Sequence, residues 1–249
     1  MSVFIKKSEM RDDSGVDHTP VLAFKGVSTE PDPRFDSPLW DVTFTLSRGE
    51  LLLIRLERGR YRLPLADLAA GVLEPMQGTV EFFGENWLRM LPDYSATRRG
   101  KIGRVFEDHG WISNLDIGEN IVLAQRHHSN RSDSDIEAEA TQLARMFGLP
   151  GLPQRALAGM HREDLGRSAF IRAFLGNSAL IILERPTRNL FPGIMPPLMN
   201  AIRTARSRGS AVIWTTSEDR VWSDSGIQAT LKCTMFGSRM NVIKESDNG

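Results

Sequence analysis

Short apolar segments, separated by proline and glycine, recur through the first part of the chain. Residues 21–27 and 42–46 are predicted strands joined by a proline-rich loop. Leu51-Leu52-Leu53-Ile54 has no polar position, which is typical of a strand buried on both faces. A helix is predicted after Pro64, because apolar residues then recur at three- and four-residue spacing: Leu65, Leu68, Ala69 and Val72.

Strand and helix patterns alternate in the rest of the chain. Strands are predicted at residues 79–83, 102–106, 179–183 and 211–214, helices over most of 117–176 and over 197–208, and a β-hairpin at 227–243 around Phe236-Gly237-Ser238. In the long helical stretch, Ser134 to Glu137 has capping-box spacing, and one apolar face is formed by Ile136, Ala140, Leu143, Ala144 and Phe147. The pattern predicts a parallel α/β core divided by a helical insertion.

Composition narrows the class of protein only moderately. The 249 residues are 41% hydrophobic and 25% charged, as in globular proteins, and the zero net charge gives no overall attraction to nucleic acid. The single cysteine, Cys233, excludes an internal disulfide framework and is expected in a half-buried strand. No apolar run approaches the ~20 residues of a membrane-spanning helix. We expect a cytoplasmic protein with a polar, disordered tail at residues 1–19 and a polar tail at residues 244–249.

Five phrases along residues 20–243 resemble the framework of ATP-binding-cassette (ABC) ATPases in order and spacing. They are Leu39 to Val42 with Leu46 to Glu50, Ala70 to Val80, Ile102 to Phe106, Asn114-Leu115 with Glu119-Asn120, and Ile171 to Asn177 before Glu184 to Thr187. One such phrase is weak, but five in the family's order are specific. The resemblance implies a single domain with a P-loop NTPase-like α/β core, an antiparallel β subdomain and an inserted helical subdomain at about 108–170. The phrase at 114–120 also resembles the Mla/Mce-type lipid-transport branch.

The family's phosphate loop falls on residues 56–64, where its chemistry is lost. A working loop, G-x-x-x-x-G-K-[ST], needs glycines for close approach to the phosphates, a lysine to neutralise them and a hydroxyl for Mg²⁺. Tyr61, Arg62 and Leu63 stand at the second glycine, the lysine and the hydroxyl. Leucine cannot ligate Mg²⁺, and Pro64 has no N–H to donate. The other loop positions are Leu56 (the first glycine), Glu57, Arg58, Gly59 and Arg60.

The other motifs implied by the resemblance are altered as well. The Q-loop glutamine is Glu107, the Walker B aspartate is Glu184, and the signature L-S-G-G-Q falls on Met160, His161, Arg162, Glu163 and Asp164. Arg185 stands where the family has its general base, and a guanidinium cannot accept a proton. The D-loop and switch-histidine positions are Phe191 and Ser217. No catalytic position is therefore intact.

Some of these residues also have a structural interpretation. The arginines at 55, 58, 60 and 62 could bind an anion, but a solvated or salt-bridged loop is favoured because Glu57 and Asp67 are near. Trp111 is equally compatible with a groove that receives a permease's coupling helix and with core packing. No metal site is expected, since His127, His128 and His161 lack metal-ligand spacing.

Three functions stay open at this point. The first is a catalytically inactive ABC-type subunit, a scaffold or regulator that docks a permease and pairs with itself or another cassette. Because two cassettes of the family sandwich each ATP between one loop and the partner's signature, this chain would spoil both sites. The second is a divergent ATPase that binds ATP and Mg²⁺ through Arg62 and Glu184 and hydrolyses slowly. The third is a soluble regulatory protein without a permease.

For the first function we expect no bound cofactor, no nucleic-acid partner and no insertion into the membrane. The chain would lie at the inner face of the membrane, held there by its partner. ATP and Mg²⁺ would be needed only under the second function.

Overall fold

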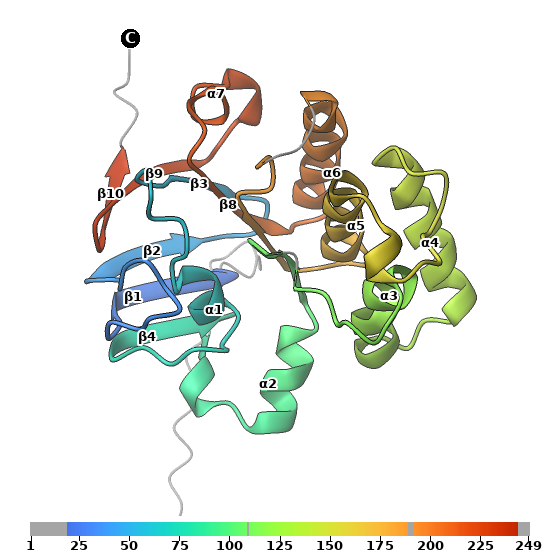
Figure 1. Cartoon of the computed structure of the whole chain (residues 1–249). Helices are drawn as coiled ribbons and strands as arrows, with labels where there is room; N and C mark the ends of the chain where they lie inside the picture. Colours follow the sequence, from blue (N-terminus) through green and yellow to red (C-terminus); the bar gives the residue numbers. More distant parts are fainter. Residues whose placement is uncertain (1–18, 109, 189–191, 244–249) are drawn as a thin grey trace, which may run out of the picture.

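The computed structural model describes residues 19–108, 110–188 and 192–243 as two sheets flanked by helices (Figure 1). The predictions for Phe191 and for the ends of the chain, residues 1–18 and 244–249, lie outside these ranges. A four-stranded antiparallel sheet has the order β2-β1-β4-β5, with β1 Leu22–Ser28, β2 Val42–Leu46, β4 Gln77–Phe82 and β5 Glu85–Asn86.

A six-stranded sheet has the order β10-β9-β3-β8-β7-β6. Its strands are β3 Leu51–Arg55, β6 Ile102–Val105, β7 Leu180–Glu184, β8 Ala211–Thr216, β9 Leu231–Phe236 and β10 Arg239–Ile243. All neighbours are parallel except β9 and β10, which form the hairpin predicted from the sequence.

The parallel sheet is the middle layer of the molecule. On β3, Leu51 and Leu53 pack with the long helices, whereas Leu52 and Ile54 pack with the antiparallel sheet and α1. Because successive strand residues point to opposite faces, burial on both sides requires an unbroken apolar run. This explains the sequence of β3, and β8 is buried along its whole length for the same reason.

Three helices pack against one another beside the core: α3 Ile117–His128, α4 Asp133–Met146 and α5 Arg162–Phe174. Figure 1 shows them grouped on the side of the molecule away from the antiparallel sheet. The other helices are α1 Leu65–Ala69, α2 Pro92–Arg99, α6 Met195–Ser207 and α7 Asp219–Trp222. Short 3₁₀ turns lie at Trp87–Arg89, Leu157–Gly159, Pro192–Ile194 and Ser225–Ile227. Within the described ranges, no helix is long and apolar enough to cross a membrane.

Local predictions were wrong at three places. Helix α1 ends at Ala69 and leaves Val72 66% exposed, because Gly71 turns the chain with φ 63° against Trp87. The cap of α4 is Ser132, not Ser134, since the Ser132 hydroxyl accepts the Asp135 N–H. The helical stretch is interrupted between α4 and α5, where only one 3₁₀ turn forms. The apolar face from Ile136 to Phe147 is confirmed as core.

Candidate functional site

The candidate site lies where β3, β6, β7 and β8 end, at the carboxyl edge of the parallel sheet, the usual place for ligands in open α/β sheets. The segment predicted as a degenerate phosphate loop follows β3. Its first N–H, on Leu56, donates to the Thr216 carbonyl at 2.7 Å and fixes the loop to the end of β8. The Arg60 N–H donates to the Glu57 carbonyl at 3.1 Å, and Gly59 between them has φ 83°. The chain therefore makes a tight turn here.

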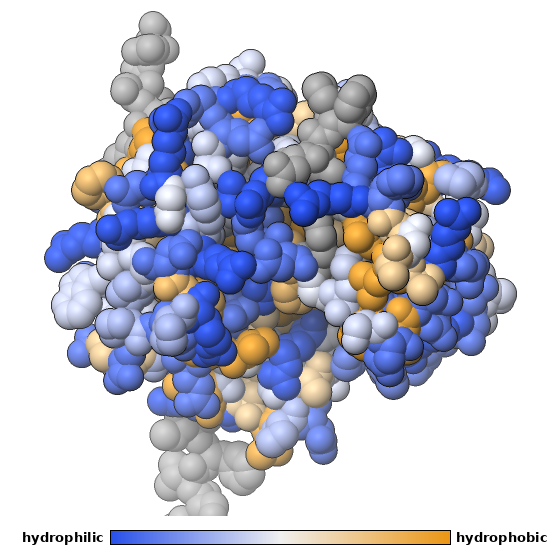
Figure 2. All heavy atoms as spheres, in the orientation of Figure 1, coloured by the Kyte–Doolittle hydropathy of each residue, from blue (hydrophilic) through white to orange (hydrophobic). Residues whose placement is uncertain are grey.

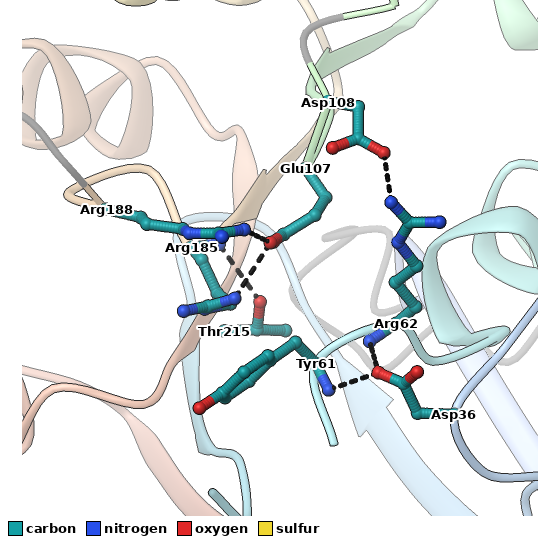
Figure 3. A network of polar contacts seen from close by, with 8 residues as sticks. All are labelled: Asp36, Tyr61, Arg62, Glu107, Asp108, Arg185, Arg188 and Thr215. Carbon is teal, nitrogen blue, oxygen red and sulfur yellow. Dashed lines mark hydrogen bonds and ion pairs between the residues drawn. The ribbon is translucent and has the colours of Figure 1, made fainter. Parts of the chain in front are cut away.

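Asp36, from the loop between β1 and β2, closes this turn. One of its carboxylate oxygens, Oδ2, accepts the backbone N–H groups of Tyr61 at 2.7 Å and Arg62 at 2.8 Å (Figure 3). The Asp36 N–H donates in return to the Arg62 carbonyl at 2.8 Å. The hydrogen bond from the Arg62 N–H is the main reason that the pKa of Asp36 lies below its ordinary value.

The arginines of the turn are held by carboxylates, so the salt-bridged interpretation is confirmed. Arg62 donates to Asp108 at 2.6 Å, Arg60 lies 3.5 Å from Glu57, and both Arg55 and Arg58 face Asp219. Asp67, which was expected near this turn, pairs with Arg104 instead. Arg62 is thus directed at an acid of its own chain.

Arg185 sits at the centre of a second group of contacts. Its guanidinium donates to Glu107 at 2.8 Å, and both side chains are about nine-tenths buried, with 9% and 10% exposure. Arg188 donates to the same Glu107 oxygen, and the other oxygen has no hydrogen-bond partner. The ring of Tyr61 lies under the Arg185 guanidinium, 3.7 Å from it (Figure 3). Arg185 has a left-handed backbone (φ 45°), and its N–H is held by Thr215.

Arg104 forms a third set of ion pairs. From β6 it donates to Glu184 at 2.6 Å and to Asp67 at 2.6 Å. Burial raises the pKa of Glu184, and the neighbouring Arg104 opposes that rise. Glu184, the predicted Walker B position, therefore has its carboxylate engaged by an internal cation.

A cavity of about 370 Å³ separates these groups from the start of α5. It is lined by Glu107, Asp108, Glu184, Arg185 and Arg188, and on the other side by Met160, Arg162 and Leu165. Across the described residues, no group of three His, Cys, Asp or Glu side chains is placed to hold a metal ion.

The predicted site residues separate into two sets. Those at positions 61, 62, 107, 184 and 185 come together around the networks above. The predicted signature meets them only across the cavity, where Met160 and Arg162 form part of the opposite wall. His161 is exposed at the start of α5, and Glu163 pairs with Arg167 on its own helix at 3.3 Å. For Ser217, which follows β8, no contact places it in these networks. Leu63 and Pro64 are buried, and Pro64 precedes α1 as a helix start.

Sequence reasoning missed four participants: Asp36, Arg104, Asp108 and Arg188. A signal existed for Arg104, because a charged residue inside a buried strand needs a partner. Asp36 lies in a proline-rich loop that carries no pattern, so its position against the turn is visible only in the folded chain.

Two of the larger hollows among the described residues lie elsewhere. One of about 980 Å³ is at the amino edge of the parallel sheet, lined in part by Arg48, Lys101 and Ser210, and it contains none of the predicted site residues. The other, of about 500 Å³, lies between β6 and α3 and is lined in part by Phe106, Ile112 and Leu123. In Figure 2 apolar residues gather over the α3 and α5 side of the face, while hydrophilic residues cover most of the rest.

Comparison with known proteins identifies relatives of this chain. It is 29% identical over 187 residues to the xylose import ATP-binding protein XylG of Paraburkholderia xenovorans, which covers 72% of this chain and 36% of XylG. It is 27% identical over 192 residues to the phosphonates import ATP-binding protein PhnC 2 of a Synechococcus species, covering 73% and 70%. The chain thus spans only about a third of the sugar-import relatives. No protein-family model matches.

Solved structures agree on the fold. A dimeric bacterial ABC transporter cassette, MJ0796, superposes with a TM-score of 0.76 at 17% identity, covering 90% of this chain and 99% of the cassette. The ATP-binding subunit of another ABC transporter superposes with a TM-score of 0.74 at 20% identity, covering 90% of each chain. The chain therefore has the ABC ATPase fold, a P-loop NTPase-like α/β core with an antiparallel sheet. It is a relative of the ATP-binding subunits of ABC transporters.

Proposed function

We propose that this chain is a catalytically inactive ABC-type subunit that serves as a scaffold or regulator of a transport complex. The observation that carries the proposal is the pairing of every carboxylate that lines the 370 Å³ cavity with an arginine of the same chain. Glu107 is held by Arg185 and Arg188, Glu184 by Arg104, and Asp108 by Arg62. A carboxylate oxygen that already accepts a guanidinium hydrogen bond is not free to accept the hydrogen bond of an attacking water.

The loop supports the same proposal. Leu63, at the position of the Mg²⁺ hydroxyl, is 8% exposed and packs in the core between the sheets. The two N–H groups at positions 61 and 62 are already bonded to Asp36, and Arg62 is directed at Asp108. A nucleotide would have to displace both contacts and would still lack a metal ligand at position 63.

The proposed partner is a membrane permease, by analogy with the import proteins that this chain resembles. The groove of about 500 Å³ between β6 and α3, with Ile112 43% exposed on its wall, supplies an apolar docking surface. Trp111 does not line this groove; it packs against the core with Arg172 over its ring, which supports the core-packing interpretation. The chain would then be peripheral at the membrane through this partner.

Steady-state hydrolysis and calorimetric titration with Mg·ATP test the proposal. We expect no turnover above background and no saturable heat at millimolar ATP for the purified chain. The Glu184→Ala variant is the matched control, because it removes the carboxylate on which a divergent ATPase would depend. Mg²⁺-dependent turnover that disappears in Glu184→Ala would establish the divergent ATPase and refute the inactive subunit.

Membrane association is tested separately. The inactive-subunit proposal expects the chain to sediment with membranes only when its permease is co-expressed, and Ile112→Asp to weaken that association. If the chain stays out of the membrane fraction even when a permease encoded beside it is co-expressed, that result would support a soluble regulator instead.

A further inference from the structure

The turn at residues 57–62 keeps one property of an anion site. The consecutive N–H groups of Tyr61 and Arg62 converge on a single oxygen, Asp36 Oδ2, at 2.7 and 2.8 Å. Successive backbone N–H groups that point at one spot form a small positive concavity that favours oxyanions. The oxyanion that accepts these two hydrogen bonds is the carboxylate of Asp36.

The charged side chains around the turn pair with one another. The turn carries Arg58, Arg60 and Arg62, whose side chains are 86%, 47% and 55% exposed. The acids that face them are Glu57, Asp108 and Asp219, so the three cations are matched by three partners. The Asp36 carboxylate adds a further negative charge, which contacts the backbone N–H groups rather than a guanidinium.

We propose that the 57–62 turn is an anion-binding site whose resident ligand is the Asp36 carboxylate, and that a phosphate-type oxyanion binds there once this carboxylate is removed. Asp36 blocks such a ligand in two ways, since it uses the same N–H donors and repels a second negative charge. The ligand class is a metal-free oxyanion, because the turn has no hydroxyl at position 63 to hold Mg²⁺. The inference rests on the proposed function in one respect: both assume that the turn of the native chain holds no nucleotide.

Titration with inorganic pyrophosphate in the presence of EDTA tests the inference. We compare the native chain with Asp36→Ala by calorimetry and by the rise in Tm with pyrophosphate concentration. Asp36→Ala is expected to bind pyrophosphate at least about tenfold more tightly than the native chain, since two charge-assisted hydrogen bonds become available.

Asp32→Ala is the matched control. It removes one negative charge from the same loop, but among the described residues the Asp32 carboxylate accepts hydrogen bonds only from Arg34, through its side chain and its N–H. It is expected to leave pyrophosphate binding unchanged. If Asp32→Ala tightens binding as much as Asp36→Ala, the effect is long-range charge and the inference is wrong.

Two further outcomes would overturn the inference. One is a folded Asp36→Ala chain, by circular dichroism, that binds no pyrophosphate; the other is a native chain that binds it equally well. If Asp36→Ala does not fold, Asp36→Asn keeps an oxygen for both N–H groups and removes the charge. It must then bind pyrophosphate more tightly than the native chain, or the inference fails.

The result is independent of the test of the proposed function. Hydrolysis of Mg·ATP by the native chain would refute the inactive subunit, whereas only metal-free pyrophosphate binding decides the role of Asp36.

Discussion

The guanidinium of Arg185 lies 3.7 Å from the centre of the Tyr61 ring, so two residues that the sequence resemblance assigns to different motifs contact each other directly. Arg185 stands after Glu184 at the end of β7, and Tyr61 stands in the turn after β3. Each substitution alone would leave a space or an unpaired charge. Together with Glu107 they form a packed and largely paired group.

The contact between Tyr61 and Arg185 contributes to stability. Tyr61→Ala is expected to lower the free energy of unfolding by about 1–2 kcal/mol, because it removes a cation–π contact with a mostly buried guanidinium. Tyr61→Phe keeps the ring face and should stay within about 0.5 kcal/mol of the native chain. Urea unfolding curves measure both values, and an equal loss in the two variants would attribute the effect to the hydroxyl instead.

The buried pair of Glu107 and Arg185 is expected to behave as one unit. Glu107→Leu or Arg185→Met alone should cost about 3–5 kcal/mol, because each leaves a buried charge without its main partner. The double variant should recover most of that loss, which a double-mutant cycle from urea unfolding would measure.

The control for this cycle is Arg34→Ala. Arg34 pairs with Asp32 at the surface with 66% of its side chain exposed, so its removal should change stability by about 0–1 kcal/mol. A loss for Glu107→Leu no larger than the control would show that the buried pair is unimportant for folding.

The closure of the turn by Asp36 should depend on pH with a definite sign. Its pKa in the folded chain is below the ordinary 3.8, because the Arg62 N–H stabilises the carboxylate. The unfolded chain therefore takes up the proton first as the pH falls, so the contribution of Asp36 is present above about pH 3.8 and is lost as the pH falls through the lower folded value. The stability difference between the native chain and Asp36→Ala should shrink from pH 6 to pH 3 in urea unfolding. A difference that grows would contradict the assignment.

Cys233 should be unreactive in the folded protein. It lies 1% exposed on β9, where burial raises the pKa of its thiol to about 11. At pH 8 an aromatic disulfide reagent is expected to label it only when the chain unfolds, so the labelling rate should rise by several orders of magnitude between buffer and 8 M urea. Rapid labelling in buffer would show that β9 and β10 open locally.

The order of elements and the architecture were readable from the sequence for a physical reason. Central strands buried on both faces require continuous apolar runs, and Leu51 to Ile54 and Ala211 to Trp214 fulfil that requirement with no help from distant residues. The face from Ile136 to Phe147 followed from its helical spacing in the same way. Helix ends were less readable. The end of α1 depends on Gly71 packing against Trp87, and Trp87 lies further along the chain, outside the local pattern of the helix.

The chemistry available at two predicted motif positions was also readable from the sequence, since Arg185 cannot be a base and Leu63 cannot be a metal ligand in any fold. Only the tertiary structure decided which partners the charged groups of the site contact. It placed Asp36 against two backbone N–H groups, Arg104 between Asp67 and Glu184, and Arg188 beside Glu107. Ion pairs and hydrogen bonds between residues far apart in the chain depend on three-dimensional distance, which local spacing does not contain.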